Sequence, residues 1–190
     1  VPQKTPKEAK VNYVIDMAQP YFLDSIAYLR YPHYADSLIQ STRSQSVLKS
    51  EENFNVLKLE EERQRLSNLF RNHGYYYYRP EFTTYRADTL QKSGYVSLQV
   101  LPRNGIPAEA KKQYYIGNTS VYLTGYDNEP PTDTLRLRTM TFYYSGKKPG
   151  IRPNALMRNV FFRKGELFSQ DRQTFTQEAI ARMGVFRYSE

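Results

Sequence analysis

Residues 59–78 read Leu59-Glu-Glu-Glu-Arg-Gln-Arg-Leu-Ser-Asn-Leu-Phe-Arg-Asn-His-Gly-Tyr-Tyr-Tyr-Tyr78, and this stretch carries the most informative pattern in the chain. Its apolar residues recur at helical spacing, Gly74 is the residue type that ends a helix, and four tyrosines favour a strand directly after it. The same order returns near the end of the chain, where Ser169 begins a predicted helix and Gly184-Val-Phe-Arg-Tyr188 follows it. This repetition predicts two copies of one strand–helix–helix–strand unit.

The predicted helix over residues 56–73 has one apolar stripe and oppositely charged ends. Asn53 or Asn55 is its candidate N-cap, and Gly74 follows its last turn. The acidic triplet 60–62 lies near the positive end of the helix dipole, which favours an electrostatic interpretation over a catalytic cluster. The stripe consists of Val56, Leu59, Leu66, Leu69, Phe70 and His73.

Strands are predicted on both sides of this helix. Residues 11–15 and 22–31 alternate as strands, and residues 95–101 form the clearest one. The aromatic run 75–85 is also predicted as a strand, in which two of the four rings of residues 75–78 would face the helices. Pro80 would restrict that strand to an edge or a bulge, because proline cannot donate to a ladder. A proline- and glycine-punctuated linker over residues 103–111 is the best boundary between the two copies.

The second copy is longer than the first. It opens with a predicted strand over residues 113–123, which echoes residues 21–29, and it then carries an insertion with an alternating segment over 135–144. We expect this segment to form a hairpin laid on the opening strand. Pro153 fits the first position of a short helix, and Ser169 caps the next. The apolar line of that last helix is either Thr176, Ile180 and Met183 or Phe175 and Ala179.

Composition favours a folded chain over a disordered one. The chain has 190 residues, 39% of them hydrophobic and 15% aromatic, with no cysteine and a net charge of +8. His33 and His73 have no neighbour at metal-ligand spacing, and His73 fits a packed or capping role at its helix end. Because no catalytic motif occurs, we predict no catalytic residue, cofactor or metal. The charge and 18 tyrosines leave a nucleic-acid-binding module as the alternative.

The order of elements resembles the polypeptide-transport-associated (POTRA) domain. The resemblance extends to Lys164-Gly-Glu-Leu-Phe-Ser169 before the last helix and to Met183-Gly-Val-Phe186 after it. The chain is similar to the periplasmic POTRA modules of BamA/TamA-type outer-membrane assembly factors (surface antigen family), in versions common in Bacteroides-like bacteria. This implies an α+β fold of tandem βααββ modules, each a small mixed sheet packed against two helices. Whether the parent is BamA-like or TamA-like stays open.

The resemblance also implies a division of the chain. Residues 1–19 would be a linker and the closing strand of a preceding module, 20–103 a POTRA-like module, and 112–190 a second module that is incomplete at its C-terminus. The second module carries its insertion at about 124–150. Two arrangements would complete its sheet. Strands would pair between molecules head to tail, through residues 11–15 or 184–188, or the hairpin over 135–144 would fill the gap in the same chain.

The implied function is peptide binding in the periplasm. As part of an outer-membrane protein, the modules would bind unfolded outer-membrane protein segments or accessory assembly lipoproteins by adding a strand to a sheet edge. The membrane would be reached only through a C-terminal barrel outside this sequence, and no nucleic acid is expected as a partner. The predicted binding edge is the strand over 75–85, with contacts from Tyr77, Arg79, Phe82 and Tyr85.

Overall fold

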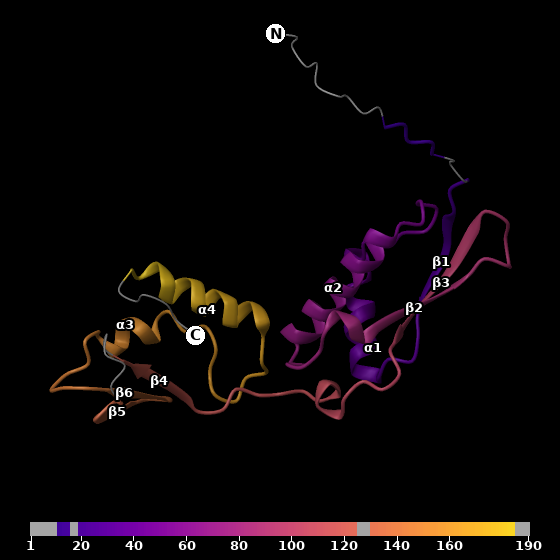
Figure 1. Ribbon diagram of the computed structural model, residues 1–190. Helices are drawn as coiled ribbons and strands as arrows, with labels where there is room; N and C mark the ends of the chain where they lie inside the picture. Colours follow the sequence, from indigo (N-terminus) through magenta and orange to yellow (C-terminus); the bar gives the residue numbers. More distant parts are fainter. Residues whose placement is uncertain (1–10, 16–18, 125–129, 185–190) are drawn as a thin grey trace, which may run out of the picture.

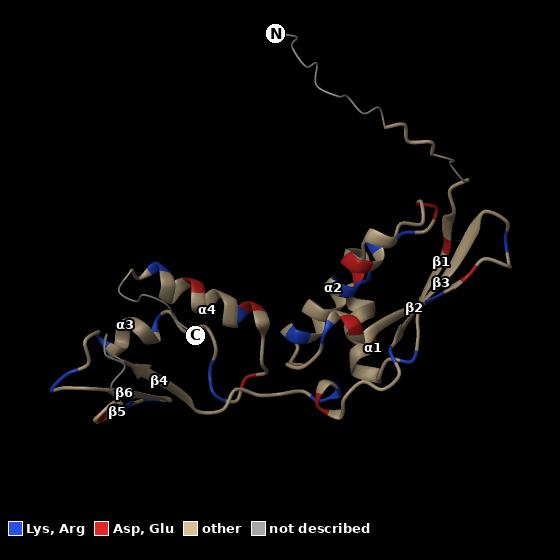
Figure 2. Ribbon diagram, in the orientation of Figure 1, with Lys and Arg blue, Asp and Glu red and all other residues tan. Residues whose placement is uncertain are grey.

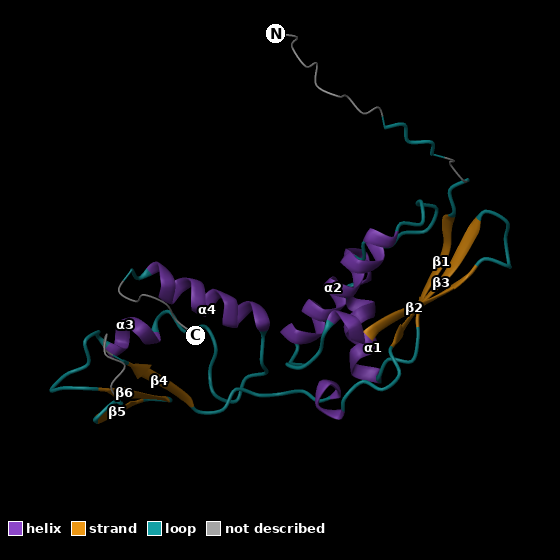
Figure 3. Ribbon diagram, viewed as in Figure 1, coloured by secondary structure: helices purple, strands orange, loops and turns teal. Residues whose placement is uncertain are grey.

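The computed structural model describes residues 11–15, 19–124 and 130–184, which form two α+β modules joined by a linker (Figure 1). In each module the helices lie on one face of a three-stranded sheet (Figure 3). The elements of the first module are β1 (Phe22–Tyr28), α1 (His33–Ser41), η1 (Arg43–Gln45), α2 (Val56–Asn72), η2 (Pro80–Phe82), β2 (Thr83–Asp88) and β3 (Tyr95–Pro102). Their order confirms the predicted βααββ arrangement.

The first sheet has the strand order β1-β3-β2. β3 pairs in parallel with β1 and antiparallel with β2, so the strand that closes the module lies in the middle of the sheet. The side chains of Val96, Leu98 and Val100 on β3 are buried. Leu98 and Val100 meet Leu66 and Phe70 of α2 in one core, as the helical stripe predicted. The predicted apolar stripe is wrong at one position, because the Val56 side chain is 68% exposed and does not join the core.

The ends of α2 follow from its sequence. The side chain of Asn55 accepts a hydrogen bond from the Leu57 N–H and so is the N-cap. Gly74 takes a φ of +96°, which only glycine adopts without strain, and the Tyr75 N–H donates to the Phe70 carbonyl at 3.1 Å in a Schellman-type end. The His73 ring nitrogen Nδ1 lies 2.7 Å from the Leu69 carbonyl oxygen, in agreement with the predicted capping role.

The predicted strand over residues 75–82 is wrong. After Gly74 the chain keeps turning, because the Tyr78 N–H donates to the Tyr75 carbonyl at 3.0 Å, and Pro80 begins the 3-10 helix η2. Tyr75 and Tyr78 are both buried, with ring centroids 5.7 and 4.6 Å from that of Phe70. Packing two rings three residues apart against one phenylalanine requires a turn, since a strand would place them on opposite faces.

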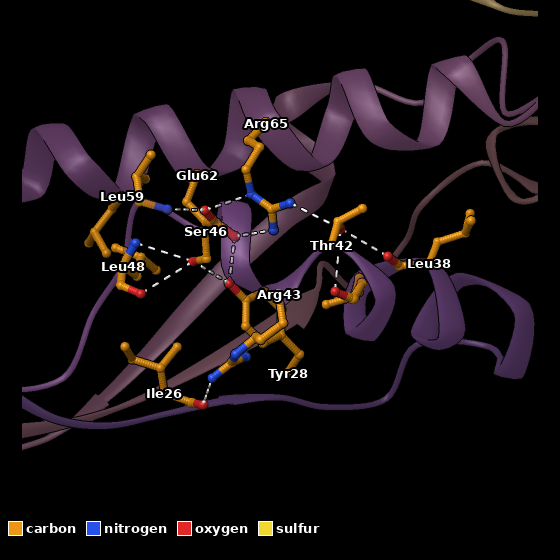
Figure 4. Close-up of polar contacts among 12 residues, drawn as sticks. Ile26, Tyr28, Leu38, Thr42, Arg43, Ser46, Leu48, Leu59, Glu62 and Arg65 are labelled. Atoms are coloured by element: carbon orange, nitrogen blue, oxygen red, sulfur yellow. Dashed lines mark hydrogen bonds and ion pairs between the residues drawn. The ribbon is translucent and has the colours of Figure 1, made fainter.

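A buried carboxylate connects β1 to the helices (Figure 4). Glu62 is fully buried, and its oxygens accept hydrogen bonds from the Tyr28 hydroxyl at 2.5 Å and the Arg65 guanidinium at 2.6 and 2.9 Å. The Val47 N–H donates to the same carboxylate at 3.2 Å. Of the acidic triplet, Glu62 therefore has a structural role that helix electrostatics alone did not predict, because a buried charge must be paired and hydrogen-bonded.

The linker contains the 3-10 helix η3 (Ala108–Lys111). The elements of the second module are β4 (Thr119–Leu123), β5 (Asp133–Leu137), β6 (Met140–Tyr144), α3 (Pro153–Met157) and α4 (Gln170–Arg182). The predicted opening strand is shorter than expected, since residues 113–118 form only an isolated bridge between Tyr115 and Leu167. Pro153 is the first helical residue of α3, and Ser169 caps α4, as predicted. The predicted strand over 184–188 lies largely outside the described residues.

The inserted hairpin supplies two of the three strands of the second sheet. Its order is β4-β6-β5, with β6 parallel to β4 and antiparallel to β5, which repeats the pairing of β1, β3 and β2. In the first module the hairpin follows the helices, whereas here it precedes them. The hairpin over 135–144 thus fills the sheet within the same chain, through Met140 and Phe142, which are buried with Leu156 of α3. Residues 11–15 form no strand, and their role as closing strand of a preceding module stays a prediction.

Candidate functional site: the β2 edge

The first sheet ends in two edge strands, of which β1 is largely covered. The Leu23 N–H donates to the Glu52 carbonyl at 2.8 Å, and the Glu51 N–H donates to the Leu23 carbonyl at 2.7 Å. Farther along β1, the Arg43 guanidinium donates to the Ile26 carbonyl at 2.6 Å. Within the described residues, β2 is therefore the edge of this sheet that remains open to an added strand.

The register identifies which backbone groups of β2 point away from the sheet. The Arg103 N–H donates to the Phe82 carbonyl at 2.7 Å, and hydrogen-bonded pairs alternate along an antiparallel ladder. The pairing of β2 with β3 then directs the backbone groups of Thr84 and Arg86 toward β3. Those of Thr83, Tyr85 and Ala87 are directed outward, where they provide donors and acceptors for a new strand.

Side chains fix β2 on the module before any ligand binds. The Thr83 hydroxyl lies 3.1 Å from the Tyr78 hydroxyl, and the Tyr85 hydroxyl donates to the Leu59 carbonyl of α2 at 2.7 Å. The Arg63 guanidinium lies 5.1 Å from the Tyr85 ring centroid, within cation–π range. Burial raises the pKa of Tyr78 to about 12 and also raises the pKa of Tyr85, so both phenols keep their protons at neutral pH. These contacts hold the β2 edge in place without a ligand.

Two arginines lie on the sheet surface near the end of β3. Arg30 and Arg86 line a small cavity of about 180 Å³ together with Thr84, Leu101 and Asn104. Arg30 follows β1 and has a φ of +63°, a left-handed conformation that is uncommon for a residue with a side chain. The two guanidinium groups give this part of the sheet surface a positive charge without any matching carboxylate among the lining residues.

The structure separates the four predicted contact residues. Tyr85 lies in β2, but Phe82 ends η2 and Arg79 precedes it. Tyr77 lies in the turn after α2, where its ring is 5.2 Å from that of Tyr114 in the segment leading to the second module. The prediction of one continuous edge strand is wrong for these three residues because the chain turns after Gly74. Ala87 and Arg86, which sequence reasoning missed, depend on pairing with β3 and have no local signal.

No family model matches the sequence, and no curated protein matches it. Similar solved structures are POTRA3–5 of BamA from Haemophilus influenzae (9% identity, TM-score 0.49), POTRA1–3 of the periplasmic domain of Omp85 from Anabaena (14%, 0.33) and the N-terminal domain of Omp85 from Thermosynechococcus elongatus (12%, 0.32). The matched regions cover 90, 88 and 90% of this chain, respectively. The chain spans only 53, 57 and 58% of the length of these three structures.

The first module has the βααββ order of a POTRA-like fold. The second module repeats the strand pairing of the first, but its hairpin precedes its two helices, so the predicted βααββ order is wrong for this module. Among the described residues, no helix is long and apolar enough to cross a membrane, and no cluster of three or more metal-binding side chains occurs.

Proposed function

We propose that this chain is a periplasmic POTRA segment of a BamA/Omp85-type outer-membrane assembly factor. In this role the β2 edge accepts an extended segment of an unfolded barrel precursor, or of an accessory lipoprotein, as a fourth strand of the first sheet. The observation that carries the proposal is the difference between the two edges. β1 is covered by residues 51–54 and Arg43, whereas the outward backbone groups of β2 have no partner among the described residues.

Strand addition suits a receptor for many sequences. Main-chain hydrogen bonds supply affinity without reading side chains, and the preformed edge lowers the ordering cost on the receptor side. Arg86, exposed on β2, adds attraction for segments that carry carboxylates. An unfolded barrel precursor and an accessory lipoprotein could each supply an extended segment of this kind.

The test is a proline placed where the edge must donate. Ala87 is exposed, and the register directs its N–H outward, so Ala87→Pro removes one donor and blocks the edge while leaving the β3 ladder paired. Ala87→Val is the matched control because it keeps the N–H. In the ¹⁵N-labelled full chain, we expect a peptide from a barrel strand to shift amides of residues 83–88 in the parent and in Ala87→Val, but not in Ala87→Pro.

Two results would reject the proposal. One is peptide binding that Ala87→Pro leaves unchanged. The other is a single-stranded oligonucleotide that shifts the amides more strongly than the peptide at physiological salt, which would favour the nucleic-acid alternative. Figure 2 shows Lys and Arg interspersed with Asp and Glu over both modules.

A further inference from the structure

The second module contains a cleft that the proposed function does not use. It has a volume of about 450 Å³ and lies between α4 and the segment before it. Arg172, Phe175 and Arg182 of α4 form one side. Phe161, Arg163 and Glu166 of the preceding segment form the other. Phe175 was one candidate for the buried line of α4, yet it is 54% exposed, and Phe161 is 48% exposed.

The walls of the cleft are held in place by hydrogen bonds. The Phe161 N–H donates to the Thr176 hydroxyl of α4 at 3.0 Å, and the Arg172 guanidinium donates to the Glu166 carboxylate at 2.7 Å. The backbone of Glu166 is tied in turn to Ile116, whose N–H donates to the Glu166 carbonyl at 2.8 Å. Because both walls are anchored, a ligand would meet a formed site and the chain would lose little conformational freedom on binding.

The lining combines exposed aromatic rings with excess positive charge. Three arginines face one glutamate, and Glu166 already pairs with Arg172. The Arg182 guanidinium donates to the Glu178 carbonyl at 3.3 Å and lies 3.9 Å from the Glu178 carboxylate. The Arg163 side chain makes no hydrogen bond or ion pair among the described residues. Arginine and large aromatic side chains are the residue types that contribute most binding energy in protein interfaces. Arginine also binds carboxylates through two parallel hydrogen bonds.

We propose that this cleft docks an acidic segment of a partner protein, in which carboxylates flank an aromatic or large aliphatic side chain. The apolar side chain would pack between Phe161 and Phe175, and the carboxylates would pair with Arg163 and Arg182. A run of nucleic-acid phosphates fits less well, because Glu166 in the wall and Glu178 beside Arg182 interrupt the positive surface. This site lies on the second module and goes beyond the proposed role of the β2 edge.

The test uses the full chain and a defined probe. The probe is a fluorescein-labelled peptide in which aspartate and glutamate flank two phenylalanines, and its Kd is measured by anisotropy at physiological salt. We expect Arg163→Ala and Phe175→Ala each to raise the Kd about tenfold, the loss typical of a central interface residue. Lys164→Ala is the matched control, since Lys164 is an exposed cation next to Arg163 that does not line the cleft. It should change the Kd less than about twofold.

Control peptides and a second variant complete the design. Probes with lysine in place of the acidic residues, or alanine in place of phenylalanine, should bind at least about tenfold more weakly. Ala87→Pro should leave the Kd of the acidic probe unchanged, so failure here is distinguishable from failure at the β2 edge. The proposal is overturned if the acidic probe does not bind the parent, or if Arg163→Ala and Phe175→Ala bind as the parent does. It is also overturned if phosphatidylglycerol vesicles or an oligonucleotide displace the probe while the lysine peptide binds equally well.

Discussion

Asn72 and Asp171 are joined by two hydrogen bonds that cross from one module to the other. The Asn72 Oδ1 accepts the backbone N–H of Asp171 at 2.9 Å, and the Asn72 Nδ2 donates to the Asp171 carboxylate at 2.8 Å. The end of α2 thus helps to cap the start of α4, beside Ser169, whose hydroxyl also donates to Asn72 Oδ1 at 3.2 Å. Figure 1 shows these two helix ends facing each other. The modules are therefore held by specific polar contacts as well as by the linker.

Asn72→Ala should loosen this junction without unfolding either module. The N-terminal N–H groups of α4 would lose one acceptor, a cost of about 0.5–2 kcal/mol. We expect the rotational correlation times of the two modules, measured by ¹⁵N relaxation, to diverge in the variant. Asn68→Ala is the control, because Asn68 is exposed on the same helix and its side chain hydrogen-bonds, among the described residues, only to Gln64. Equal relaxation in both variants would show that Asn72 does not couple the modules.

Gly74→Ala should lower the unfolding free energy by more than the strain of an alanine backbone at this φ would alone. The added Cβ would lie 2.8 Å from the Leu167 Cδ2 of the second module, and the φ of +96° is itself strained for alanine. The expected cost is about 1–3 kcal/mol of unfolding free energy. Gly105→Ala separates the two effects, since Gly105 has a φ of +79° and nothing within 4 Å of a Cβ. Equal losses in urea unfolding would argue against a close approach at Gly74.

Leu66→Ala should be strongly destabilising because Leu66 is fully buried in the first core. Truncations of this kind cost about 2–5 kcal/mol. Val56→Ala, on the same helix but 68% exposed, should stay within about 0.5 kcal/mol. A loss below half a kilocalorie for Leu66→Ala in denaturant unfolding would contradict the placement of α2 on the sheet.

Alkaline pH should destabilise the first module. Burial and the bond to Glu62 raise the pKa of Tyr28 to about 12, and burial raises that of Tyr78 similarly. A raised folded-state pKa means that the unfolded chain loses its proton first, so this contribution is complete below about pH 10 and is lost between about pH 10 and 12. Absorbance at 295 nm should therefore rise together with loss of far-UV circular dichroism.

Tyr28→Phe checks the assignment of this alkaline effect. The variant removes a hydrogen bond to a buried carboxylate, which should lower stability at pH 8 by about 1.5–3 kcal/mol. Its stability should also fall less steeply between pH 10 and 12, because one buried phenol is gone. An unchanged slope would mean that Tyr28 titrates alike in the folded and unfolded chains.

Several elements could be predicted because their sequence signals are local. Asn55, Gly74 and an apolar spacing of three to four residues define α2, and alternation over residues 95–101 and 135–144 defines β3 and most of the β5–β6 hairpin. Repetition also predicted two modules. These features are local because a cap, a turn or a stripe depends on residues within a few positions of one another.

How those elements pack together depends on contacts between distant parts of the chain. The run 75–82 has the composition of a strand, yet the packing of Tyr75 and Tyr78 on Phe70 makes it a turn. The open edge therefore moves to β2, and its outward groups follow from pairing with β3. Phe175 has an apolar side chain typical of a core residue, but it lines a cleft and is half-exposed. Burial and register arise from contacts between residues far apart in the chain, and no local pattern encodes them.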